Sequence, residues 1–169
     1  MPRLIENPGL IPWQGSAVYS PCKRYRTRLT RVWDESLPVC NFCMLNPSTA
    51  TAEKNDPTVR RALGYAQRWN HGALIVTNIF ALRATNPREL CETPDPVGPG
   101  NDEAILNAAR EADLVVGAWG NHAELNSRGA HVIEMLTNAG VELHALKTTG
   151  KGHPAHPLYQ KADAVPHRM

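Results

Sequence analysis

Four short polar motifs carry the residue types best suited to chemistry, and each follows an apolar run typical of a buried strand. They are Asn46-Pro47-Ser48, Asn78, Trp119-Gly120-Asn121 and the segment from His153 to Leu158. In an open parallel α/β sheet, ligands bind in the crevice beyond the carboxyl ends of the strands. The four motifs therefore predict a single site assembled from four loops.

The residue types limit what each motif can do. Asn46 offers one acceptor and two donors, so it can orient a water or a polar ligand, but it cannot remove a proton at neutral pH. Asn78 presents a donor beside an acceptor, as side chains that read the edge of a nucleobase do. Each asparagine has an alternative structural role. Asn46 could be a turn residue that bonds its own backbone, and Asn78 could cap its strand.

The histidine segment is the third source of chemistry. His153 and His156 are each followed by proline, and histidine can stabilise a group that gains negative charge as it leaves. A Pro-rich tail with solvent-exposed histidines is the alternative. Metal binding by His153, His156 and His167 is a minor option, since no carboxylate or cysteine accompanies them at suitable spacing. We therefore expect neither a metal nor a cofactor.

Gly120 and Asn121 would let a ligand approach the backbone closely after a buried strand. The sequence contains no phosphate-binding loop, dinucleotide fingerprint or Gly-x-Ser-x-Gly elbow. Hydride transfer, ATP hydrolysis and serine hydrolysis are accordingly not supported.

The elements that must position these motifs alternate between strands and helices. Apolar runs predict parallel strands at 39–45, 73–77, 113–119 and 141–146. Helices are predicted at 57–69, with Asp56 as N-cap, and at 102–112 and 127–138. Residues 86–100 predict an irregular loop. The alternation indicates an α/β fold of three αβα layers around a central, mainly parallel four-stranded sheet.

Length and composition suit an ordinary globular domain. The 169 residues are 42% hydrophobic and 20% charged, which predicts one domain over residues 1–169 with an irregular arm at 1–20. No apolar run reaches the roughly 18 residues needed to cross a bilayer, so we expect no membrane contact and a cytoplasmic location. Cys40 and Cys43 should be buried on opposite faces of one strand rather than bind a metal.

The formal charge of +2 is small, but basic residues gather near the N-terminus. Residues 23–33 predict an antiparallel edge strand with one basic face, formed by Lys23, Arg24, Arg26, Arg28 and Arg31. That face would either bind phosphates or protect the edge from aggregation.

Taken together, the motifs resemble those of the uracil-DNA glycosylase superfamily. Met44 to Ser48 resembles its first active-site motif, Val76 to Ala84 its base-reading strand, Ala118 to Ala123 its Trp-Gly-x-x-Ala strand end, and His153 to Leu158 its His-Pro-Ser-Pro-Leu loop. A closer resemblance is to a bacterial and phage domain family of unknown function, marked by Met-Leu-Asn-Pro-Ser-Thr-Ala, Asp-Pro-Thr-x-Arg-Arg and His-Pro-Leu-Tyr.

The superfamily resemblance implies a DNA glycosylase that cleaves the N-glycosidic bond of a damaged or modified base flipped from single- or double-stranded DNA. Asn46 would position water, Asn78 would bind the base, and His156 or His153 would stabilise the departing base. Ser48, Trp119, Gly120 and Asn121 would complete the pocket, and Lys23, Arg24, Arg26 and Thr49 would contact DNA phosphates. The superfamily's classical catalytic aspartate is absent.

Two other functions remain open from the sequence. One is a hydrolase of free nucleotides or nucleosides, for which the small net charge is adequate. The other is a catalytically silent DNA-binding module that retains the pocket. No obligate protein partner is evident.

Overall fold

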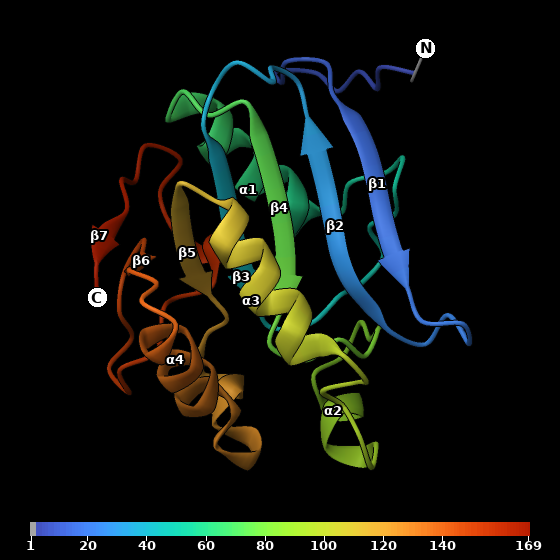
Figure 1. Ribbon diagram of the computed structural model, residues 1–169, viewed down its shortest axis with the longest axis vertical. Coiled ribbons are helices and arrows are strands. Elements are labelled where there is room, and N and C mark those ends of the chain that lie inside the picture. The colour runs from blue at the N-terminus through green and yellow to red at the C-terminus, as the bar shows by residue number, and fades with distance from the viewer. Residues whose placement is uncertain (1–2) are drawn as a thin grey trace.

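The chain forms an α/β fold around one seven-stranded mixed sheet, as a computed structural model that describes residues 3–169 shows (Figure 1). The strands lie in the order β1-β2-β4-β3-β5-β6-β7. Their bounds are β1 Gln14–Tyr19, β2 Arg26–Val32, β3 Val39–Met44, β4 Ala73–Asn78, β5 Leu114–Ala118, β6 Leu143–Ala145 and β7 His167–Arg168. The predicted α/β class is confirmed, but the sheet has seven strands rather than four.

Parallel and antiparallel pairs divide the sheet. β4, β3, β5 and β6 pair in parallel, whereas β1, β2 and β7 add antiparallel edges. The chain runs from β3 to β4 on one side and then returns past β3 to β5. This reversal of direction opens a crevice at the carboxyl ends of β3 and β5.

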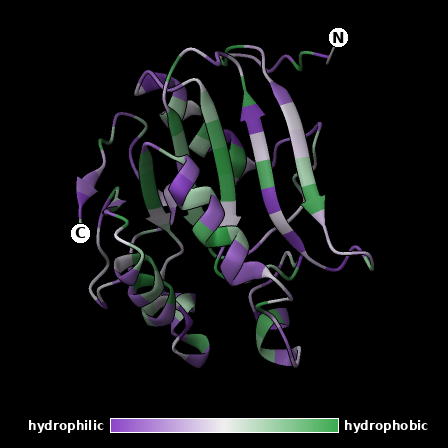
Figure 2. Cartoon of the chain, in the orientation of Figure 1, coloured by the Kyte–Doolittle hydropathy of each residue, from purple (hydrophilic) through white to green (hydrophobic). Residues whose placement is uncertain are grey.

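Of the four helices in residues 3–169, three cover the two faces of the sheet, and the shortest lies beyond the ends of the strands (Figure 1). The four are α1 Pro57–Arg68, α2 Arg88–Glu92, α3 Asn101–Glu111 and α4 Arg128–Asn138, and the short 3-10 helices are Asn121–Ser127 and Pro157–Tyr159. Figure 1 shows α1 behind the sheet and α3 and α4 in front of it. Figure 2 shows the central strands as the most hydrophobic part of the molecule, because helices cover both of their faces.

The predicted helix at 57–69 is confirmed as α1. Asp56 accepts the backbone N–H of Val59 at 2.8 Å, and Pro57 occupies the first helical turn. On its inward side, the Tyr65 and Trp69 rings stack with Phe42 of β3, at centroid distances of 6.2 and 5.9 Å. This packing fixes the loop that joins β3 to α1.

Three predictions about the termini and loops need correction. Residues 1–20 are not only an irregular arm, because β1 pairs with β2 along Gln14–Tyr19 and Trp13 is fully buried. β2 therefore lies inside the sheet rather than at its edge. The loop at 86–100 contains α2, a single turn that buries Leu90.

Cys40 and Cys43 are buried on opposite sides of β3, as predicted. Burial raises the pKa of both thiols, that of Cys43 to about 11, so neither is a thiolate at neutral pH. Over residues 3–169, no helix is long and apolar enough to span a lipid bilayer.

Candidate functional site

A cavity of about 610 Å³ lies at the carboxyl ends of the parallel strands, a size typical of small-molecule sites. The loops after β3, β4 and β5 and the histidine segment all contribute to its lining. Of the predicted site residues, it brings together Arg26, Asn46, Ser48, Asn78, Trp119, Gly120, Asn121 and His156. His153, Lys23, Arg24 and Thr49 do not line it.

Asn46 is held in one orientation at the end of β3. Its Nδ2 donates to the carbonyl oxygens of Ala84, at 2.7 Å, and of Pro47, at 3.0 Å. Both amide donors are therefore used, and Oδ1 remains as a hydrogen-bond acceptor. The side chain can accept a hydrogen bond from a water or from a ligand donor in the cavity.

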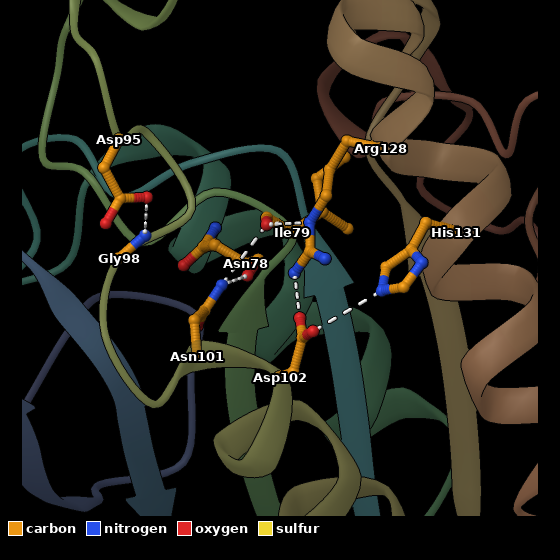
Figure 3. Close-up of polar contacts among 8 residues, drawn as sticks. All are labelled: Asn78, Ile79, Asp95, Gly98, Asn101, Asp102, Arg128 and His131. Atoms are coloured by element: carbon orange, nitrogen blue, oxygen red, sulfur yellow. Dashed lines mark hydrogen bonds and ion pairs between the residues drawn. The ribbon is translucent and has the colours of Figure 1, made fainter.

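Asn78 ends β4 with its side chain in the cavity lining and only 3% exposed. Its backbone is fixed from behind, where the buried Asn101 donates to the carbonyl oxygens of Asn78 and Ile79 at 2.9 and 3.2 Å. Arg128 donates from Nε to the same Ile79 carbonyl at 2.7 Å (Figure 3). The end of β4 is thus a rigid platform for the Asn78 amide.

An ion pair supports this platform. Arg128 binds Asp102 at 2.6 Å, and His131 lies 3.4 Å from the other carboxylate oxygen (Figure 3). Burial raises the pKa of Asp102, but the hydrogen bond and charge of Arg128 outweigh it and hold that pKa below its usual value. Asn101 and Arg128 are not among the site residues predicted from the sequence. The local sequence signal for Asn101 is Gly100 before a first helical turn that contains Asp102.

His156, rather than His153, lines the cavity. Its Nδ1 accepts the backbone N–H of Leu158 at 3.3 Å, so the neutral ring carries its proton on Nε2. Burial is the main cause that lowers the pKa of His156, which favours this neutral form. His153 instead lies 3.6 Å from Glu124, outside the cavity lining.

Two glycines hold the histidine segment against β5. A side chain on Gly117 would place its Cβ 2.9 Å from Cγ of Pro154, so only glycine admits the proline ring there. Gly120, at φ +74°, donates its N–H to the Pro154 carbonyl at 2.8 Å. These contacts bring His156 beside the loop that contains Trp119 and Asn121.

The continuous basic face predicted on β2 is wrong. Arg26 and Arg31 are 2% and 0% exposed, because the loop after β3 folds over β2 and its carbonyl oxygens accept their N–H groups. Arg28 forms an ion pair with Glu111. Lys23, Arg24 and Thr49 are exposed.

A smaller basic cluster lies beside the cavity instead. It consists of Lys23, Arg24 and Arg83, which share one surface depression, and Arg83 donates its backbone N–H to the Arg24 carbonyl at 2.9 Å. The next two residues, Ala84 and Thr85, line the cavity. The cluster therefore adjoins the cavity lining along the chain at Arg83 and Ala84, and its depression also contains Glu89.

Asp56 was predicted only as a helix cap, yet it also lines the cavity. Among the lining residues it carries the one carboxylate. Its two oxygens accept backbone N–H groups from Val59 and Ala50 at 2.8 and 3.4 Å. The spacing of ten residues from Asn46 gave no local signal of this proximity.

The family described as "Protein of unknown function (DUF1643)" matches residues 24–158. The match covers most of the chain and all cavity-lining residues except Tyr159 and Gln160, so the chain belongs to this family. No curated protein and no solved structure matches it.

Proposed function

We propose that this member of the DUF1643 family is a uracil-DNA glycosylase-like hydrolase, which cleaves the N-glycosidic bond of a base flipped out of DNA. One observation carries the proposal: Asn46, Asn78 and His156, from three separate loops, line a single cavity at the sheet's switch point. A flipped base needs a deep pocket with polar groups for its edge, and chemistry needs a water and a stabilised leaving group.

The attacking water would bind between Asn46 and Asp56. The free Oδ1 of Asn46 accepts one water hydrogen and so fixes the direction of attack on the anomeric carbon. Asparagine cannot take the proton, but the Asp56 carboxylate lines the same cavity. Asp56 would then supply the general base that the sequence motifs lack.

The base itself would be held by Asn78 and His156. The backbone of Asn78 is held by Asn101, and its side-chain amide offers a donor and an acceptor to the base edge. Neutral His156 donates from Nε2 to a base oxygen that gains negative charge as the bond breaks. A hydrogen bond of this kind strengthens in the transition state and therefore accelerates cleavage.

DNA contact would use the rim of the cavity. Lys23, Arg24 and Arg83 supply positive charge for phosphates beside the mouth. Tyr159 lines the cavity and is 83% exposed, which leaves its ring free to stack on a neighbouring base.

The test is an abasic-site assay on single-stranded and duplex DNA that carries a panel of natural and modified bases, including uracil and hydroxymethylated or glucosylated pyrimidines. We expect alkali-sensitive breaks at one class of base. Loss of cleavage in Asn46→Ala would assign the activity to this cavity. Absence of breaks with every base would reject the glycosylase proposal.

DNA binding separates the two alternatives if no base is cleaved. Binding that weakens steeply with salt, measured by fluorescence anisotropy, would favour a silent DNA-binding module. Absence of DNA binding would favour a hydrolase of free nucleotides or nucleosides. Lys23→Ala combined with Arg24→Ala should reduce the salt slope by about 2 if these side chains contact phosphates.

A further inference from the structure

Two buried arginines on β2 differ in how their charges are satisfied. Arg31 uses all three guanidinium nitrogens in hydrogen bonds to the loop after β3 and stacks on Trp13, with 4.1 Å between guanidinium carbon and ring centroid. Arg26 is equally buried, but only its Nη1 has a partner among residues 3–169, the Ala50 carbonyl at 2.9 Å. Arg31 is a structural residue, whereas Arg26 has unused hydrogen-bonding capacity.

The charge of Arg26 is also not neutralised by an ion pair within the described chain. Asp56 is close enough to raise the pKa of Arg26, but no ion pair joins the two side chains. Burial lowers that pKa to about 10, so the guanidinium remains charged at neutral pH. A buried charge without a partner is costly, and its Nε is buried with no acceptor.

Arg26 lines the cavity, and its Nη2, which has no partner among residues 3–169, is the guanidinium nitrogen that a ligand oxygen can reach. The hydroxyl-bearing residues Ser48 and Thr58 line the same cavity, and Thr58 lies in the first turn of the twelve-residue helix α1. A guanidinium and hydroxyl groups favour a negatively charged oxygen ligand, whereas the first turn of α1 is already capped by the Asp56 carboxylate.

We propose that Arg26 forms an anion subsite inside the cavity, so that the substrate carries an oxyanion, as a carboxylate on the base or as a phosphate. This inference rests on the proposed function in one respect, because it takes the cavity to be the site that binds the substrate. An anionic group bound there by a charge-assisted hydrogen bond from Arg26 would distinguish the substrate from the unmodified pyrimidines, which are neutral.

The direct test is an NMR titration of the ¹⁵N-labelled protein that observes the arginine Nε–H signals and the backbone amides. The probes are inorganic phosphate, uridine 5′-monophosphate, 5-carboxyuracil and neutral uracil. We expect at least one organic anion to shift the Arg26 Nε–H signal and the amides of Ser48, Thr58 and Gly120. That anion should bind about tenfold or more tightly than uracil.

The probes also separate the two sources of negative charge. Tighter binding of 5-carboxyuracil than of the nucleotide would assign a carboxylate-bearing base, and the reverse order would assign a phosphate. If every anion binds no better than uracil, or the Arg26 signal does not move, the subsite is wrong.

Variants on the same strand give the matched control. Arg26→Met should lose about tenfold or more in anion affinity with little change for uracil, whereas Arg28→Met removes the same charge outside the cavity and should bind as the wild type does. If Arg26→Met does not fold, Arg26→Lys should retain the preference for anions over uracil. Wild-type anion affinity in a folded Arg26→Met would overturn the proposal. Because no cleavage is measured, a failed glycosylase assay would leave this result intact.

Discussion

Replacement of Arg31 by methionine should remove a large part of the stability of the fold. Arg31 makes five hydrogen bonds, four to the backbone carbonyls of Thr30, Thr51, Ala52 and Lys54 and one to Asn55. Each is worth on the order of 1 kcal/mol net, so their loss should lower the free energy of unfolding by about 5 kcal/mol. The free energy of unfolding of a domain is only about 5–15 kcal/mol, so this single change could remove most of it.

The measurement is urea unfolding at neutral pH, followed by circular dichroism. Arg28→Met is the control, because its ion pair with Glu111 is partly exposed and should contribute only about 0–1 kcal/mol. Arg31→Lys should lie between the two, since one ammonium group cannot reach all five acceptors. A loss below about 1 kcal/mol in Arg31→Met would refute the structural role of this arginine.

Three further changes test the parts of the site. Gly117→Ala would place a Cβ 2.9 Å from Pro154 and should cost about 1–3 kcal/mol in urea unfolding, whereas Gly150→Ala, with open space around it, should be neutral. Because burial lowers the pKa of His156, the unfolded chain takes up the proton on this ring at a higher pH than the folded chain does. The free energy of unfolding should therefore fall as the pH drops below 6.5. His156→Gln should reduce this fall. Unchanged pH dependence in His156→Gln would contradict the burial of this ring. Asn78→Asp replaces a donor by an acceptor and should change base preference across the substrate panel, so an identical preference would remove Asn78 from base reading.

The regular elements were predictable because their signals are local. The Asp56-Pro57 start of α1 and the apolar runs of β3, β4 and β5 each identify an element from its own residues. β1 was missed because its alternating exposed residues and flanking prolines resemble an irregular segment. Its pairing with β2 and the burial of Trp13 become visible only in three dimensions.

The sequence indicated which loops line the cavity, but not where the charged side chains around it lie. Asn46 follows β3, Asn78 ends β4 and His156 follows β6, and the parallel order of these strands with β5 places their ends together. Arg26 and Arg31 are buried because their guanidinium groups donate to carbonyl oxygens about twenty residues away in the sequence. No local pattern specifies the path of the loop that carries those oxygens. Asp56 shows the same limit, because one side chain both caps α1 and lines the cavity.

Single-turnover cleavage by Asn46→Ala, measured beside its DNA affinity and its unfolding curve, tests the central claim most directly. If the Asn46 Oδ1 positions the attacking water, the variant should cleave the substrate base at least about a hundredfold more slowly. Its DNA affinity should be unchanged, and its stability should fall by about 2 kcal/mol with the loss of the two hydrogen bonds to Pro47 and Ala84. Cleavage at the wild-type rate by the folded variant would contradict the assignment of catalysis to this cavity.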